Sequence, residues 1–274
     1  MEEHHSITKR FKIPKIDYIN ISGFSQSSFR TGFIIEPYNI CLDAGIPTKV
    51  KPNIILITHG HLDHIASLHS LLYDNYECPI ICPSEIHGHI TKMIQAFYCM
   101  NNNIGGKKLN LNFIHEPFSF NIGKNNFQVV RYDLDHRVPT YAYGIHIIKR
   151  QLKEIYMGKS GKEIGELRKT TDIYENLNIS LLLYCCDTGK SALHHINMGI
   201  YPIIFIECTF IDPEHIEESI SRKHLHWCDI EPYVQKYKDS QFNLIHFSRR
   251  YSNEKIKVFS LEIKEKYKNV EFWI

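Results

Sequence analysis

An apolar run that ends directly in a cluster of histidines constrains this chain more than any other feature. Residues 54–57 are apolar, and the sequence THGHLDH follows them at once, so three histidines and an aspartate fall between residues 59 and 64. The next apolar residues at helical spacing are Leu62, Ile65, Leu68, Leu71 and Leu72. The pattern predicts a buried strand that gives way to a helix, with the histidines at the junction.

The spacing of this cluster predicts a metal site. His59 and His61 are two residues apart, so on an extended or loop backbone their rings point to one side, while Asp63 and His64 begin the helix and point to a neighbouring position. Two adjacent metal positions are therefore expected. Because a zinc ion takes three or four ligands, distant residues must complete them. The candidates that each end a predicted strand are His136, Asp187 and His246.

The rest of the chain repeats this alternation of strands and helices. In the first half, strands are expected over 16–21, 32–36, 39–43, 54–58 and 79–82, mostly as hairpins, with a helix from Ser84 to about Met100 and a polar loop at 101–108. Further strands are expected over 127–133, 141–148, 179–186, 202–207, 242–247 and 270–274, with an acidic helix near 214–218 and an amphipathic helix over 256–267. Two similar halves predict two packed sheets with helices outside, in a single domain over 1–274. We interpret the charge-rich residues 149–178 as a surface excursion, a solvated loop or helix in preference to an RNA-binding arm.

The composition indicates the cellular location of the protein more clearly than its function. The 32 Lys and Arg residues nearly balance 30 Asp and Glu residues, so nucleic-acid binding would require a local basic patch. The 8 cysteines form no CxxC pair and mostly lie in apolar runs, which indicates reduced thiols and an intracellular, cytoplasmic or nuclear protein. The sequence shows neither a signal-peptide core nor a run of about 18 apolar residues, so we expect no membrane association.

These motifs resemble a known family. THGHLDH is similar to the signature of the metallo-β-lactamase superfamily, whose α/β fold is a four-layer αβ/βα sandwich with a dinuclear metal site. Three later motifs, LDHRVPTYAYGI, CDTGK and LIHFSRRY, resemble those of ribonuclease Z (tRNase Z) in the right order. The resemblance implies His59, His61 and His136 on one metal ion, Asp63, His64 and His246 on the other, and Asp187 bridging both. It implies two Zn²⁺ per chain, with Mn²⁺ or Fe²⁺ as alternatives, because these ligand types do not decide among the three metals.

The resemblance also implies a mechanism. Two divalent ions about 3.5–4 Å apart would lower the pKa of a shared water and supply hydroxide at neutral pH. Asp63 would orient that nucleophile as well as bind metal. The segments IECTF and RKHLHWCDIEPYV supply Glu207 and His224, a dyad suited to protonating the departing ribose 3′ oxygen. His226 is the alternative to His224, and either histidine is alternatively a helix cap on the surface.

Substrate contacts are suggested at two further places. Arg249 and Arg250 follow the last ligand motif, where they would hold a phosphate or pair with the acidic helix near 214–218. Ser27, in the loop that leads to Arg30, is a candidate for RNA contacts. Asp43 is expected to hydrogen-bond a ligand histidine. The family's Gly-Pro-rich stretch between the third histidine and the aspartate is not found. If the arm that grips tRNA is absent or altered, the substrate would differ from precursor tRNA.

We therefore expect a metal-dependent phosphodiesterase, most directly a tRNA 3′ processing endoribonuclease that acts on precursor tRNA. The resemblance further implies a homodimer. A small-molecule hydrolase of the same superfamily, such as a cyclic-nucleotide phosphodiesterase, a lactonase or a β-lactamase, is the alternative. A third possibility is a non-catalytic RNA-binding or partner subunit, which a complete ligand set argues against.

Overall fold

The first half of the chain builds a six-stranded mixed sheet. The computed structural model describes residues 6–73, 76–102 and 109–274. The strands of this sheet lie in chain order: β1 (Ile7–Lys12), β2 (Tyr18–Gln26), β3 (Arg30–Glu36), β4 (Ile40–Leu42), β5 (Ile54–Leu56) and β6 (Ile80–Ile81). Strands β1 to β4 are antiparallel hairpins, whereas β4, β5 and β6 run parallel. The parallel strands end at one edge, where the histidine cluster begins.

A second, seven-stranded sheet follows. Its strands lie in the order β13-β12-β11-β10-β9-β8-β7. Their bounds are β7 (Ser119–Ile122), β8 (Asn125–Asp133), β9 (Tyr141–Leu152), β10 (Tyr174–Cys185), β11 (Ile203–Glu207), β12 (Gln241–Ile245) and β13 (Val270–Phe272). Strands β10 to β13 are parallel, and β7 to β10 are antiparallel neighbours. The carboxyl ends of β8, β10, β11 and β12 therefore meet at one edge of the sheet.

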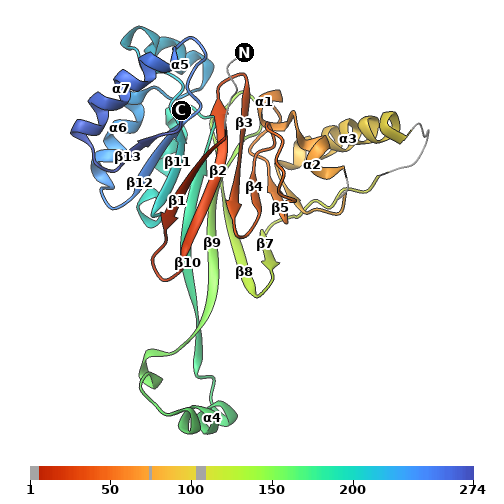
Figure 1. Cartoon of the computed structure of the whole chain (residues 1–274), viewed down its shortest axis with the longest axis vertical. Coiled ribbons are helices and arrows are strands. Elements are labelled where there is room, and N and C mark those ends of the chain that lie inside the picture. The colour runs from red at the N-terminus through yellow and green to blue at the C-terminus, as the bar shows by residue number, and fades with distance from the viewer. Residues whose placement is uncertain (1–5, 74–75, 103–108) are drawn as a thin grey trace.

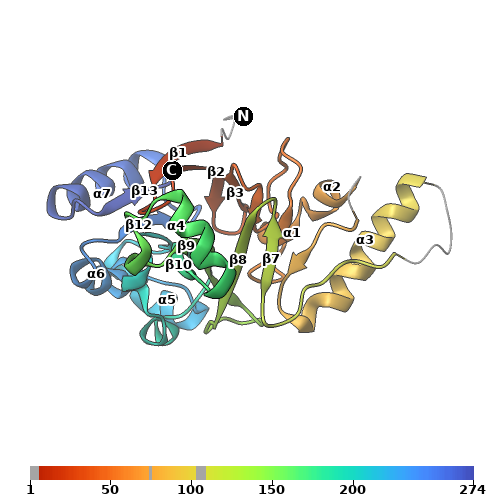
Figure 2. The same cartoon turned by 90° about the horizontal axis from the view of Figure 1, so that it is seen from below.

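Two packed sheets with helices outside give four layers, as Figures 1 and 2 show. The inner faces share one apolar core, in which Phe33 contacts Phe205 and Trp273 at ring-centre distances of 5.1 and 5.4 Å. Burial of each such side chain stabilises the fold by roughly 1.5–3 kcal/mol.

The helices over the first sheet are α1 (Leu62–Ile65), α2 (Leu68–Leu72) and α3 (His87–Asn102). The helices over the second are α5 (Ile216–Arg222), α6 (Trp227–Lys236) and α7 (Asn253–Lys266). The expected αβ/βα sandwich is confirmed.

Several local expectations differ from the structure. The single helix expected after the histidine cluster is two short helices, α1 and α2, and the segment that begins at Ser84 is a 3₁₀ turn, with Pro83 at its N-cap, that leads into α3. Strands β1 and β7 and helix α6 were not expected. Strands β1 and β7 alternate half-buried and exposed residues, so they lack the apolar run that marks the buried strands. Most of the expected loop at 101–108 lies outside the described residues.

Residues 149–178 form an arm. Strands β9 and β10 extend as a hairpin beyond the neighbouring strands, and helix α4 (Gly161–Thr170) lies at the far end, away from both sheets (Figure 1). Ser160 caps α4 through a capping box with Glu163. The segment that the charge pattern indicates as a surface excursion is thus a hairpin that carries an exposed helix.

Among the described residues, no helix is both long and apolar enough to cross a membrane.

Candidate metal centre

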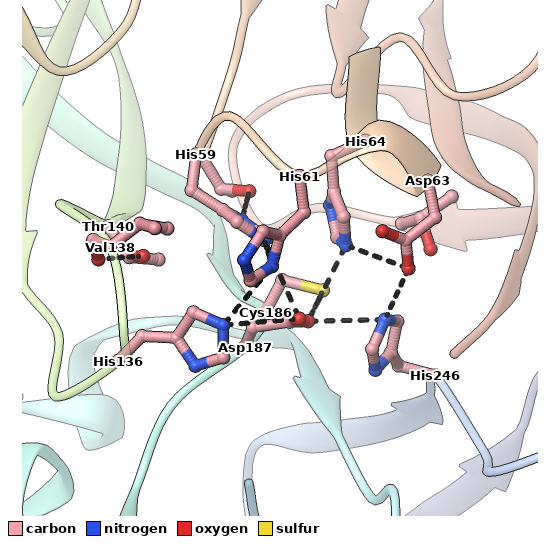
Figure 3. A network of polar contacts seen from close by, with 12 residues as sticks. His59, His61, Asp63, His64, His136, Val138, Thr140, Cys186, Asp187 and His246 are labelled. Atoms are coloured by element: carbon pink, nitrogen blue, oxygen red, sulfur yellow. Dashed lines mark hydrogen bonds and ion pairs between the residues drawn. The ribbon is translucent and has the colours of Figure 1, made fainter. Parts of the chain in front are cut away.

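The strand order explains how distant residues reach one place. His59 follows β5, and Asp187 and His246 follow the parallel strands β10 and β12, while His136 lies in the turn after β8. Because these strands end at neighbouring edges of the two packed sheets, their following residues converge, and Figure 3 shows the side chains gathered around Asp187. Both His59 and Asp187 are buried, with 0 % and 2 % of their surface exposed to solvent.

The first group of ligand atoms comprises His59, His61, His136 and one oxygen of Asp187. His61 Nδ1 lies 3.0 Å from His59 Nε2 and 3.4 Å from His136 Nε2. Oδ2 of Asp187 lies 3.6 Å from His59 Nε2 and 3.8 Å from His136 Nε2. These separations of 3.0–3.8 Å surround the roughly 3.3–3.6 Å between ligand atoms around a tetrahedral metal ion with bonds of about 2.0–2.2 Å.

The second group uses the other oxygen of the same aspartate. Oδ1 of Asp187 lies 3.2 Å from His246 Nε2 and 3.6 Å from His64 Nε2. Oδ2 of Asp63 lies 3.5 Å and 3.7 Å from the same two nitrogens. Figure 3 shows Asp187 between His136 on one side and Asp63 with His246 on the other. The structure thus brings together the residues that the resemblance assigns to the second ion, and their division between two ions stays a prediction.

Two buried nitrogens provide a direct test of whether the residues fit metal ions. Nε2 of His64 and Nε2 of His246 have no hydrogen-bond partner among the described residues, although both histidines are almost fully buried. A buried polar atom without a partner is costly unless something binds it. Both atoms face the carboxylates of Asp63 and Asp187, which is the donor set of a divalent cation. The residues therefore fit a bound metal ion.

Asp43 and Thr58 orient two of the histidines through hydrogen bonds to their Nδ1 atoms. Oδ2 of Asp43 lies 2.8 Å from His64 Nδ1, which leaves Nε2 directed inward. The Thr58 hydroxyl donates to Asp43 and therefore accepts from His59 Nδ1, at 3.0 Å. Tyr184 also donates to Asp43, at 2.7 Å. Asp43 thus holds a ligand histidine, as expected from the sequence.

The other two buried histidines are held in the same manner. The Thr209 hydroxyl donates to Glu207 and accepts from His246 Nδ1, at 3.1 Å. The backbone carbonyl of Lys223 accepts from His136 Nδ1, at 3.0 Å. Backbone strain accompanies this arrangement, because Lys223 and His246 both have positive φ, at 56° and 65°. The threonines and the Lys223 carbonyl carry no recognisable sequence pattern, and they were not predicted.

The electrostatics differ between the two groups of ligand atoms. Burial lowers the pKa of His59, His61 and His136, which keeps these rings neutral, as ligands must be. At His64, burial acts in the same direction, but the carboxylates of Asp187 and Asp43 outweigh it and raise the pKa to about 9. A cation is therefore stabilised at this point of the centre.

Cys186 lies beside the second group. Its Sγ donates to Oδ1 of Asp187 at 3.2 Å, and burial raises the pKa of the thiol well above its usual value. Its sulfur also lies within 4.8 Å of ligand atoms of His64, Asp187 and His246, so the structural role expected for Cys186 stays a prediction.

His224 and Glu207 form the expected pair at the edge of the centre. Nδ1 of His224 lies 3.1 Å from Oε1 of Glu207, and the His224 ring is 5.7 Å from the His246 ring. His226 takes another role: its side chain accepts from Cys228 N as the N-cap of α6. Of the two alternatives, His224 faces the centre and His226 caps a helix.

The residues that we expected to contact the substrate have different surroundings in the structure. Arg250 makes two hydrogen bonds to Glu218, at 2.7 and 2.8 Å, which corresponds to the ion-pair alternative. Arg249 is exposed, and its guanidinium lies 5.5 Å from the centre of the Phe29 ring. Ser27 is nearly buried, and its N–H donates to the Phe247 carbonyl at 3.1 Å. The side chain of Arg250 is thus engaged within the protein, and that of Arg249 is exposed.

Comparison with known proteins agrees with this geometry. A model of the "Beta-lactamase superfamily domain" matches residues 43–174. The chain is 24% identical over 261 residues to tRNase Z TRZ1 of Arabidopsis thaliana, covering 89% of this chain and 91% of that protein. Its fold is similar to human tRNase Z, short form, with a TM-score of 0.54, 13% identity and coverage of 92% and 95%. It is also similar to yeast PDE1, with a TM-score of 0.57, 12% identity and coverage of 92% and 95%.

The structural likenesses show the fold alone, since the sequences are so far apart. Together with the matched domain, they show that the chain has the metallo-β-lactamase fold. In sequence the chain is similar to tRNase Z TRZ1 over nearly the whole length of both chains.

Proposed function

We propose that this protein is a metal-dependent phosphodiesterase that cuts precursor tRNA after the discriminator base and leaves a 3′-hydroxyl. The observation that carries the proposal is the His224–Glu207 pair next to a double group of metal-ligand atoms. A metal centre alone serves many hydrolytic reactions. An added acid that can protonate an alkoxide favours phosphodiester cleavage with a ribose leaving group.

The residues that would hold two zinc ions are those of the two groups. His59, His61 and His136 would bind one ion, Asp63, His64 and His246 the other, and Asp187 both. When bound, two divalent cations supply Lewis-acid chemistry: they activate water and neutralise charge on a phosphodiester. Asp63 sits at the outer side of the second group, half-buried, with Oδ2 also accepting from Ser28 N at 2.8 Å. It is placed to orient the attacking water as well.

His224 would deliver the proton to the departing 3′ oxygen. Burial opposes its charge, but the Glu207 carboxylate outweighs burial and raises its pKa to about 9, so the ring is protonated at neutral pH. The Nδ1 atom is bound to Glu207, which leaves Nε2 to donate. Glu207 is fully buried and is a positioning residue that does not touch the substrate.

The arm supports RNA as the substrate class. Residues 149–178 carry seven Lys or Arg and five Asp or Glu residues, an excess of two positive charges that equals the net charge of the whole chain. Strands β9 and β10 carry this charge away from the two sheets (Figure 1). A projecting basic element suits a large polyanion that extends well beyond its cleaved bond. This arm is therefore a candidate for binding the body of the tRNA.

The test compares two substrates with the zinc-loaded protein. Precursor tRNA with a 3′ trailer and the small diester bis(p-nitrophenyl) phosphate are each assayed over a range of concentrations. The proposal expects a kcat/KM for the RNA far above that for the small diester. Turnover of the small diester without turnover of structured RNA would instead favour the small-molecule hydrolase.

A further inference from the structure

The turn between β2 and β3 is fixed to the metal centre on one side and to the last ligand strand on the other. Ser28 N donates to Oδ2 of Asp63 at 2.8 Å, and Ser28 adopts a positive φ of 57° to do so. Ser27 N donates to the Phe247 carbonyl, and Gln26 forms an isolated bridge with Phe247. The turn therefore holds its next residues, Phe29 and Arg30, at the rim of the centre.

Two arginines meet at this rim on one aromatic ring. The guanidinium carbons of Arg30 and Arg249 each lie 5.5 Å from the centre of the Phe29 ring, although the two arginines are far apart in sequence. A guanidinium within about 6 Å of a ring is attracted to it and keeps its N–H groups available for an anion. We call Phe29, Arg30 and Arg249 the arginine platform.

The charge of the platform is not neutralised within the protein. Both arginines are exposed, and neither forms an ion pair with any residue that the structure describes. Arg250, directly next to Arg249, is different because Glu218 binds it in a bidentate pair. Two unpaired positive charges held together beside candidate metal ligands favour an anion as their partner.

Building on the proposed function, we propose that the arginine platform binds a backbone phosphate of a polynucleotide next to the scissile phosphate. Asp63 accepts from Ser28, so the platform begins one residue from a group that would bind metal and orient water. A polynucleotide held at Asp63 carries its neighbouring phosphates past Phe29. Arg30 and Arg249 contact the substrate in this proposal, and Phe29 is a positioning residue that holds both guanidinium groups.

The platform would distinguish a nucleic acid from a small phosphodiester. A small diester has one phosphate, which the centre itself occupies, and gains nothing from the arginines. A polynucleotide has further phosphates, and each one neutralised releases counterions, so binding weakens as salt rises. The arginine platform is thus the part of the site that makes a polynucleotide the preferred substrate.

The experiment removes each member of the platform in the zinc-loaded, full-length protein. The variants are Arg30→Gln, Arg249→Gln and Phe29→Leu, with Phe29→Tyr to restore a ring. Lys238→Gln is the matched control, because it removes one exposed positive charge at the opposite end of β12 from His246. Affinity for precursor tRNA is measured by fluorescence anisotropy in proteins that also carry His224→Gln, which prevents cleavage during the measurement. KM and kcat are measured on both substrates in proteins that keep His224.

We expect Arg30→Gln and Arg249→Gln each to weaken RNA affinity and raise KM about tenfold. Each is also expected to reduce the slope of log affinity against log salt by about one. Phe29→Leu is expected to act in the same direction, and Phe29→Tyr and Lys238→Gln to resemble the wild type. In the platform variants, kcat/KM is expected to fall far less for bis(p-nitrophenyl) phosphate than for precursor tRNA, and Lys238→Gln is expected to leave both values unchanged.

Unchanged RNA affinity in the arginine variants would overturn the platform while leaving the proposed function in place. An equal loss on the small diester would also overturn it, because it would mean that the centre itself was disturbed. If the wild type cuts no precursor tRNA, the proposed function fails, and the anisotropy series still decides whether the platform binds RNA.

Discussion

Nδ1 of His224 lies 3.1 Å from Oε1 of Glu207, a carboxylate with no exposed surface. The same carboxylate accepts backbone N–H groups from Thr188 at 2.6 Å and from Leu225 at 3.2 Å, so its position is fixed by the chain itself. Glu207 therefore orients the ring and stabilises its charged form. A histidine held in this way is an acid at neutral pH, and its role can be separated from that of the metal ligands.

Replacement of His224 by Gln is expected to lower kcat on precursor tRNA by about 10²–10⁴-fold, the range for loss of a general acid. Because His224 is outside the two ligand groups, the zinc content measured by elemental analysis is expected to remain that of the wild type. His226→Asn is the matched control, since Asn also caps helices well, and it should keep both activity and zinc. Loss of zinc together with activity in His224→Gln would contradict the assignment.

Replacement of Glu207 by Gln is expected to change the pH dependence of stability in the metal-free protein. The pKa of His224 is raised from 6.5 to about 9, so the pair contributes stability that is complete below pH 6.5 and is lost as the pH rises through about 9. The shift corresponds to about 3 kcal/mol at most. The difference in unfolding free energy between wild type and variant should therefore shrink between these pH values in urea titrations. A difference that is independent of pH would contradict this account, and an NMR titration of His224 gives a second reading of its pKa.

Replacement of Asp43 by Asn is expected to weaken zinc binding by about 10–100-fold, the usual effect of losing a partner of a ligand histidine. Asp43 accepts from His64, Thr58 and Tyr184, all buried, so the change acts through the orientation of His64. Zinc affinity is measured by competition with a chelator. Asp17→Asn, at an exposed position, is the control. Equal affinity in the two variants would mean that Asp43 does not orient the ligand.

Replacement of Gly45 by Ala is expected to lower the free energy of unfolding by at least about 2 kcal/mol and to reduce zinc content. A Cβ atom at Gly45 would lie 1.8 Å from the backbone oxygen of Asp63 and 2.6 Å from that of Thr31, so the backbone of the ligand segment must move. Gly165→Ala in α4, where a Cβ meets nothing within 4 Å, is the control and should be neutral or stabilising. Urea unfolding and elemental analysis measure both effects, and a Gly45→Ala protein with normal zinc content would contradict the close approach.

Much of the metal centre could be predicted because its residues stand next to buried strands. The apolar run of β5 marks the position of His59, and the runs of β10 and β12 mark Asp187 and His246. Buried parallel strands are the clearest strand signals in a sequence, and their carboxyl ends share an edge. Residues placed directly after such strands can thus be expected to lie together from the sequence pattern alone.

The parts that could not be predicted have no local signal. Thr58 and Thr209 orient histidines through single hydroxyl groups, and Lys223 does so through its carbonyl, which every residue possesses. In the arm, the end of β9 and the beginning of β10 are half-buried or exposed, so no burial pattern marks them as strands. Helix α6 contains Pro232 and has His226 as its N-cap, a residue that resembles a ligand candidate as much as a cap. Only tertiary contacts decide such cases.

The most direct test of the account is the position and chemistry of the cut in a precursor tRNA with a 3′ trailer, incubated with zinc-loaded protein. We predict a single cut after the discriminator base, with a 3′-hydroxyl on the tRNA and a 5′-phosphate on the trailer, and no cut after removal of zinc with a chelator. Scattered cuts, or no cut by a protein that contains its full complement of zinc, would contradict the proposed function.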